Sequence, residues 1–209
     1  MSHAPPIMDQ QITRSTYTLV TLAYWVFMLT DGALRMVILL KFHKMGYTPI
    51  QLAFMFLLYE FAGIITNLIG GWVGARFGLR KTLFLGLAAQ IIALISLSFI
   101  SIAWAPLLAV IYVMLVQALS GIAKDLTKMS SKSSVKLLVP KTEQKSEAKL
   151  FFWVALLTGF KNALKGIGFF IGGILLSWLG YAPALQSLAG LLVITFIICL
   201  LLVLSLIHI

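Results

Sequence analysis

The stretch that decides the fold is residues 150–178, LFFWVALLTGFKNALKGIGFFIGGILLSW, an apolar run without an acidic residue. At a rise of about 1.5 Å per residue, a helix of this length can cross a hydrocarbon core about 30 Å thick. Lys161 and Lys165 stand one helical turn apart in it, and Lys161 lies roughly 18 Å beyond Lys149, near the middle of that core. Ionisable groups at this depth are expensive and usually face a cavity. We interpret the two lysines as an intramembrane site for an anion; the alternative is that they pair or snorkel to hold the bundle together.

The composition places the chain among integral membrane proteins, because 61% of its 209 residues are hydrophobic and only 11% are charged. Lipid offers no water to unpaired backbone groups, and the apolar runs lack the short alternation of barrel strands, so each span is expected to be a helix. The sequence therefore predicts an all-α membrane protein with six transmembrane helices, at residues 17–40, 50–73, 82–102, 106–123, 150–178 and 184–204.

The charges outside the spans predict the orientation. With the N-terminal tail, residues 1–16, in the cytoplasm, eleven basic residues fall inside and only Lys41 and Lys44 fall outside. The positive-inside rule therefore places both ends of the six-helix unit, residues 17–203, on the cytoplasmic side of the membrane. The basic residues are interleaved with the spans, so we expect a lipid bilayer and no nucleic acid among the partners.

The last six residues, 204–209, read LSLIHI and match the in-frame translation of a common transposase sequencing adapter. We interpret them as an artefact and expect the protein to continue in their place. His208 is accordingly given no functional role.

The connection between the second and third spans reads GWVGARFGLRK, residues 71–81. It resembles the cytoplasmic loop signature of the major facilitator superfamily, with Ala75 where that pattern usually has Asp. The resemblance implies that this chain is an N-terminal half built as an inverted pair of three-helix units, and that a missing C-terminal half completes the substrate site. It also implies a gating loop with the residues Gly71, Arg76, Gly78, Arg80 and Lys81.

Charged residues inside the first two spans also suit a cavity. Asp31 and Arg35 lie four apart in the first span, and Glu60 lies roughly 15 Å from the outer end of the second. One interpretation of Asp31 and Arg35 is a structural ion pair that fixes helix packing. The functional interpretation is that Arg35 clamps an oxyanion while Asp31 or Glu60 exchanges a proton.

A lysine stripe follows the fourth span, because Lys124, Lys128, Lys132 and Lys136 recur at a spacing of four. We interpret the last three as a solvated segment that contacts anionic lipid headgroups. Lys124 continues the helix face of Gln117 at the cytoplasmic mouth of the span, where it could collect an anion from the cell interior.

Four segments carry a resemblance more specific than the one to the superfamily. They are TDGALRM at 30–36, LYEF at 58–61, the stretch 117–140, and KNALKG at 161–166. They are similar to organoarsenical efflux transporters of the ArsJ type. The resemblance implies export of a small organic anion, 1-arseno-3-phosphoglycerate, and a functional pairing with glyceraldehyde-3-phosphate dehydrogenase, which makes this compound when it accepts arsenate. Asn162 thereby joins the expected substrate-binding residues Arg35, Gln117, Lys124, Lys161 and Lys165.

Other functions would use the same charges. A carrier of organophosphates or other small organic anions is one alternative, and a six-helix scaffold protein, in which Lys161 and Lys165 contact a partner, is another. An enzyme is disfavoured, because the spans hold no His and Glu metal cluster, no nucleophile beside an acid and a base, and no phosphate-binding glycine loop. No cofactor and no metal are expected.

The topology can be tested at Ser133, in the lysine-rich segment that we expect in the cytoplasm. A single cysteine introduced as Ser133→Cys should stay unlabelled when intact cells are treated with a membrane-impermeant thiol reagent. Labelling of intact cells would contradict the cytoplasmic assignment.

Overall fold

The computed structural model describes residues 7–101, 104–138 and 146–207. Parts of the predicted tail, of the predicted cytoplasmic segment and of the suspected adapter fall outside these ranges. Within them the chain forms helices and no strand, and the elements are α1 (Ile7–Lys44), α2 (Pro49–Met55), α3 (Leu57–Phe77), α4 (Leu79–Ser98), α5 (Pro106–Leu138), α6 (Ser146–Leu179) and α7 (Tyr181–Ile207). Six stretches of the described residues are long and apolar enough to cross a membrane, and α2 and α3 share one of them. The all-α fold with six transmembrane helices is therefore confirmed.

Of the helices that extend beyond the apolar runs predicted from the sequence, α1 and α5 do so most. Helix α1 begins at Ile7, inside the predicted tail, although its membrane-crossing part begins only at Thr18. Helix α5 continues to Leu138, so the lysine stripe belongs to the same helix as the fourth span. Hydropathy marks where a chain leaves the lipid, and a helix can continue past that point.

The second predicted span needs a correction, because the structure breaks it at Phe56 between α2 and α3. The N–H of Phe56 bonds to the Ala53 carbonyl, three residues back, which tightens the chain there. Neither proline nor glycine lies between Ala53 and Glu60 to announce the break. It falls within one turn of Tyr59 and Glu60, two side chains of the site described below.

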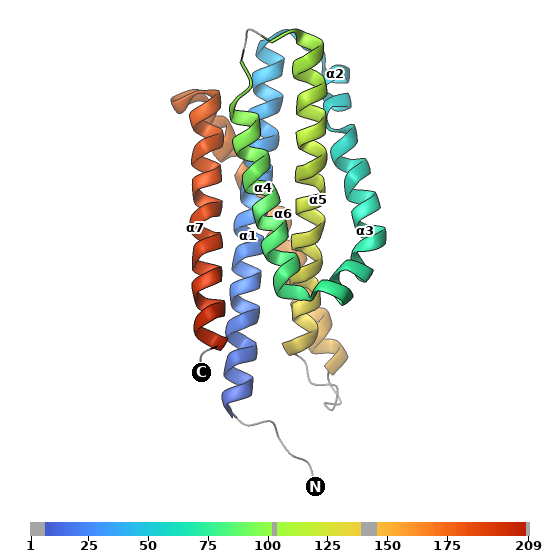
Figure 1. Ribbon diagram of the computed structural model, residues 1–209, viewed down its shortest axis with the longest axis vertical. Coiled ribbons are helices and arrows are strands. Elements are labelled where there is room, and N and C mark those ends of the chain that lie inside the picture. The colour runs from blue at the N-terminus through green and yellow to red at the C-terminus, as the bar shows by residue number, and fades with distance from the viewer. Residues whose placement is uncertain (1–6, 102–103, 139–145, 208–209) are drawn as a thin grey trace.

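Helix α1 packs against α5, α6 and α7 near the centre of the bundle, while α5 packs in turn against α3 and α4 (Figure 1). Helix α1 begins, and α5 and α7 end, at the same end of the bundle, where the turn from α3 to α4 also lies. The basic residues of that turn, Arg76, Arg80 and Lys81, therefore share an end with the lysine stripe of α5.

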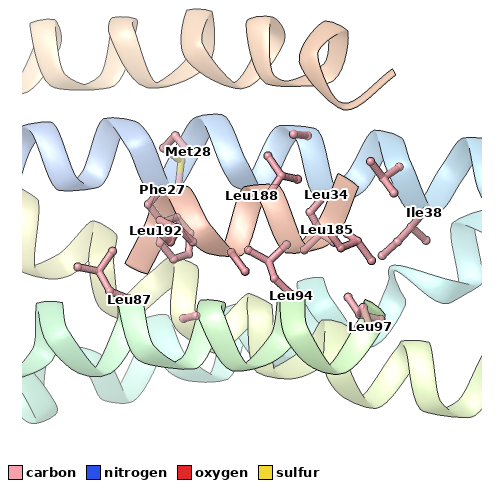
Figure 2. Close-up of a cluster of buried hydrophobic side chains, with 14 of the residues drawn as sticks. Phe27, Met28, Leu34, Ile38, Leu87, Leu94, Leu97, Leu185, Leu188 and Leu192 are labelled. Carbon is pink, nitrogen blue, oxygen red and sulfur yellow. The ribbon is translucent and has the colours of Figure 1, made fainter. Parts of the chain in front are cut away.

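Apolar side chains fill the space between α1, α4 and α7 (Figure 2). The labelled members of this buried cluster are Phe27, Met28, Leu34 and Ile38 of α1, Leu87, Leu94 and Leu97 of α4, and Leu185, Leu188 and Leu192 of α7. Inside a bilayer such contacts stabilise mainly through van der Waals packing. Asp31 and Arg35, two charged side chains of α1, are directed instead to α3 and α6.

Glycines let the backbones of α1 and α6 touch. A Cβ atom at Gly168 of α6 would overlap the Leu29 carbonyl oxygen of α1, and one at Gly32 of α1 would overlap the Lys165 carbonyl oxygen of α6. Small residues at such contacts allow close packing of membrane helices. Because Gly32 follows Asp31, this contact places Lys165 next to the segment of α1 that carries Asp31.

Replacing Gly168 by alanine should destabilise the bundle, because the new methyl group meets the backbone of α1 and pushes the two helices apart. The expected loss is about 1–3 kcal/mol in the free energy of unfolding, measured by reversible denaturation in mixed micelles. Gly159→Ala is the matched control, since nothing lies within 4 Å of a Cβ atom built there and alanine is the better helix former. Equal stability of the two variants would contradict the close contact.

Candidate functional site

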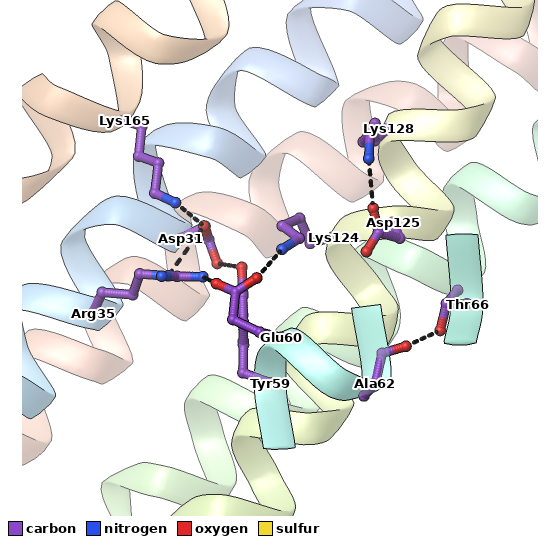
Figure 3. Close-up of polar contacts among 10 residues, drawn as sticks. All are labelled: Asp31, Arg35, Tyr59, Glu60, Ala62, Thr66, Lys124, Asp125, Lys128 and Lys165. Atoms are coloured by element: carbon purple, nitrogen blue, oxygen red, sulfur yellow. Dashed lines mark hydrogen bonds and ion pairs between the residues drawn. The ribbon is translucent and has the colours of Figure 1, made fainter. Parts of the chain in front are cut away.

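The candidate site is centred on Asp31, a side chain of α1 that is 0% exposed (Figure 3). Its Oδ1 accepts a hydrogen bond of 2.7 Å from the Tyr59 hydroxyl of α3. Its Oδ2 lies 3.7 Å from Lys165 Nζ of α6 and 3.9 Å from Arg35 Nε, one turn further along α1. A carboxylate in a low-dielectric interior is costly without such partners, so these contacts offset the cost of burying the Asp31 side chain.

Glu60 of α3 is the second carboxylate of the site, and it differs from Asp31 in exposure. Its Oε1 accepts a hydrogen bond of 2.7 Å from Arg35 Nη2, and its Oε2 lies 3.7 Å from Lys124 Nζ of α5. The Glu60 side chain is 56% exposed, against 18% for both Arg35 and Lys124. Glu60 is therefore the place where the cluster opens to the outside of the bundle.

The ring of Tyr59 lies under the two cations that hold Glu60. The guanidinium carbon of Arg35 is 4.0 Å from the ring centroid, and Nζ of Lys124 is 4.3 Å from it. Cation–π contacts between desolvated groups stabilise by about 2 kcal/mol. The sequence analysis did not include Tyr59 in the site. Its position directly before Glu60 is the one feature of the sequence that could have indicated its role.

These five charged residues form what we call the charge cluster: Asp31, Arg35, Glu60, Lys124 and Lys165. They come from four helices, α1, α3, α5 and α6, and their three cations and two carboxylates give a formal charge of +1. Among the described residues no group of three His, Cys, Asp or Glu side chains could hold a metal ion. An arrangement of this kind can attract and orient an anion.

Lys161 lies one turn before Lys165 on α6 and outside the charge cluster. Its electrostatic neighbours all belong to α5, and they are Lys124, Asp125, Lys128 and Lys132. Asp125 is buried and lies 2.9 Å from Lys128 Nζ, so Lys128 is bound within the protein, where the sequence predicted contact with lipid headgroups. None of the ion pairs among the described residues involves Lys161. The two lysines of α6 thus differ, because only Lys165 is paired with a carboxylate.

Two predicted substrate-binding residues lie apart from the charge cluster. Gln117 is fully buried on α5, and its amide has no hydrogen-bond partner among the described residues, while Ser120 nearby donates a bond of 2.6 Å to Gln90 of α4. Asn162 is exposed on α6. The described structure gives neither Gln117 nor Asn162 a hydrogen bond to the cluster, and their roles stay predictions.

The predicted gating residues surround a one-residue turn. Gly78 alone connects α3 and α4, with a positive φ of 79° that favours glycine. Gly71 lies within α3, and the side chains of Arg76, Arg80 and Lys81 are exposed around the turn. The turn lies at one end of the bundle, away from the centre of α1 where Asp31 is found, and its role in gating stays a prediction.

Asp31 should matter more for stability than Glu60, because it is the buried member of the two carboxylates. Asp31→Asn leaves Lys165 without its paired carboxylate and should lower the free energy of unfolding by about 3–5 kcal/mol. Glu60→Gln, at an exposed carboxylate, should cost about 1 kcal/mol or less. Reversible denaturation in mixed micelles measures both.

The double variant Asp31→Asn/Lys165→Met provides the control for this comparison. If the two groups neutralise each other, the double variant should be more stable than the sum of the two single losses predicts. Strict additivity would contradict an energetic coupling between Asp31 and Lys165.

Comparison with known proteins agrees with this architecture. The chain matches the family model described as the Major Facilitator Superfamily over residues 20–207, which include every residue of the charge cluster. A comparison with curated proteins finds no match. Proteins of this superfamily are membrane transporters, and the six membrane-crossing stretches of the described residues are consistent with one half of its fold. The chain therefore belongs to the major facilitator superfamily and is a multi-pass membrane protein of the transporter class.

Proposed function

We propose that this protein exports a small organic anion, and that the anion is 1-arseno-3-phosphoglycerate. The observation that supports an anionic substrate is the charge cluster, in which Arg35, Lys124 and Lys165 outnumber the two carboxylates by one. An excess cation inside a membrane protein is costly unless an anion can neutralise it. A substrate that supplies this charge would bind where the cluster is open, at Glu60.

Binding then proceeds as the replacement of the Glu60 carboxylate by an oxyanion of the substrate. The Glu60 side chain is held by Arg35 and Lys124 and is the exposed partner of both. An incoming oxyanion can take over the same donors, because the planar fork of Arg35 suits two oxygens of a phosphate-like group and Lys124 offers a point charge. Glu60, once released, is free to take up a proton, whereas Asp31 keeps its own contacts to Tyr59 and Lys165.

The arsenical substrate is supported by the resemblance to organoarsenical efflux transporters. All four segments that carry this resemblance contribute to the charge cluster, and its members from them are Asp31, Arg35, Glu60, Lys124 and Lys165. In this proposal the protein acts with glyceraldehyde-3-phosphate dehydrogenase and gives resistance to arsenate. An organophosphate carrier would use the same charges, and competition between the two substrates distinguishes it.

The orientation follows from the distribution of basic residues over the bundle. Arg76, Arg80 and Lys81 lie at the same end as the lysine stripe, and we assign this end to the cytoplasmic side of a bacterial inner membrane. A second six-helix half would cover the face on which Glu60 is exposed, as ligand sites of this superfamily lie between two halves. The substrate would then be enclosed between Glu60 and residues of that half.

Lys161 gives the sharpest test, because its removal leaves no carboxylate of the described structure unpaired. Lys161→Ala should abolish arsenate resistance in cells that also express the dehydrogenase, while the protein accumulates in the membrane at its normal level. Lys161→Arg should retain more transport than Lys161→Met, since the charge and not the size of the side chain is needed.

Transport in everted vesicles, at matched protein level, measures the effect directly. The vesicles receive arsenate, glyceraldehyde-3-phosphate, the dehydrogenase and NAD+, which accepts the hydride when the aldehyde is oxidised to the acyl arsenate. Uptake of arsenic into the everted vesicles then reports export. Undiminished uptake by Lys161→Met would refute the assignment of Lys161 to the anion site. If 1-arseno-3-phosphoglycerate does not enter the vesicles and an organophosphate does, the protein is an organophosphate carrier and the arsenical substrate is refuted.

A further inference from the structure

Two aromatic side chains of the second span lie against cations of the charge cluster. The guanidinium carbon of Arg35 is 5.6 Å from the ring centroid of Phe56, where α2 ends, and 4.0 Å from that of Tyr59, one turn further along the chain. The Tyr59 ring also contacts Lys124, whose Nζ is 4.3 Å from the centroid (Figure 3). We call Phe56 and Tyr59 the aromatic pair. An aromatic face attracts a cation although it carries no net charge.

The Tyr59 side chain is fixed by contacts on two sides. It is 0% exposed, and its hydroxyl donates a hydrogen bond of 2.7 Å to Asp31 Oδ1 of α1. Its backbone carbonyl lies against Gly121 of α5, where a Cβ atom would overlap it. The ring is thereby held between α1 and α5, the two helices that carry Arg35 and Lys124. These contacts do not involve Glu60, so the ring keeps its position when that carboxylate moves.

Displacement of Glu60 would leave its two cations with few other partners. Among the ion pairs of the described residues, Lys124 takes part only in the pair with Glu60, and Arg35 otherwise has only the 3.9 Å contact to Asp31. Because both cations lie against one ring, they are close enough to repel each other. If they separated, the site would bind an anion only in the fraction of molecules in which it had reassembled, and its apparent affinity would fall by that fraction.

We propose that the aromatic pair holds Arg35 and Lys124 in position while the substrate oxyanion replaces the Glu60 carboxylate. Phe56 and Tyr59 are then positioning residues, which act on the substrate through the two cations. This inference rests on the proposed transport of an organic anion, and it adds the groups that keep the site assembled between its two anionic partners. A neutral ring suits this purpose, because it attracts the cations and leaves intact the positive charge that draws the substrate.

Stepwise fluorination of the ring tests this role, because fluorine withdraws electrons from the ring face and changes its size little. The reference is the double variant Glu60→Gln/Tyr59→Phe, in which residue 60 no longer offers the two cations a carboxylate. The phenylalanine at position 59 is then exchanged for analogues with two, three and five ring fluorines. Calorimetry with propylphosphonate, on the purified protein in phosphatidylcholine nanodiscs, should show an affinity that falls at each step, by about tenfold over the series.

Two comparisons distinguish positioning from a structural role. In the protein that keeps Glu60, the same series at position 59 should change the affinity much less, because the carboxylate already holds the cations before the anion arrives. Phe27 is the matched control, since its ring is also 0% exposed but packs in the apolar cluster of Figure 2. Its fluorination in the Glu60→Gln variant should leave the affinity unchanged.

Phe56 gives a second test that leaves the buried tyrosine in place. The Phe56 side chain is half-buried, so Phe56→Leu removes the ring while keeping an apolar side chain at the junction of α2 and α3. It should weaken propylphosphonate binding in the Glu60→Gln variant, and much less in the protein that keeps Glu60.

Three outcomes would overturn the proposal. An affinity that is constant over the series in the Glu60→Gln variant would refute positioning by the ring and leave the anion site intact. Equal losses with and without Glu60 would assign the ring to the stability of the fold. Absence of propylphosphonate binding by the unchanged protein would refute the anion site itself, and with it the role of the aromatic pair.

Discussion

A carboxylate without access to water must be neutralised by its neighbours, and Asp31 imposes this requirement on the centre of the bundle. Its partners come from α1, α3 and α6, so these helices must keep a common register. The glycine beside it makes the arrangement possible. Because Gly32 has no side chain, the backbone of Lys165 can touch α1, and its amine then lies 3.7 Å from Asp31 Oδ2. Close packing and charge neutralisation are thus properties of the same contact.

Helix α1 separates two kinds of packing. Toward α4 and α7 it presents large apolar side chains, which interlock in the buried cluster of Figure 2. Toward α3 and α6 it presents Asp31 and Arg35, whose contacts depend on charge. Van der Waals contact holds the first group together without any polar partner. The second group can therefore keep a net positive charge and an exposed carboxylate, which a bundle held together by ion pairs alone would not tolerate.

The sequence was sufficient for the six spans, because they follow from the length of the apolar runs. It was not sufficient for the pairing of charges. The spacing of four predicted Asp31 as the partner of Arg35, yet the closer contact is to Glu60, at 2.7 Å against 3.9 Å. Contacts between helices depend on their relative rotation and register, which periodicity within one helix does not determine. The break at Phe56 has no signal in its own residues.

Arg35 and Tyr59 link the two carboxylates of the cluster. Arg35 contacts Glu60 through Nη2 and Asp31 through Nε, and Tyr59 lies under its guanidinium while donating to Asp31. A substrate that takes Glu60 away from Arg35 therefore acts on a group that also neutralises Asp31. The exposed carboxylate is coupled to the buried one without a contact between them. In a transporter such coupling lets occupancy of the open side alter the balance of charge that holds α1, α3 and α6 together.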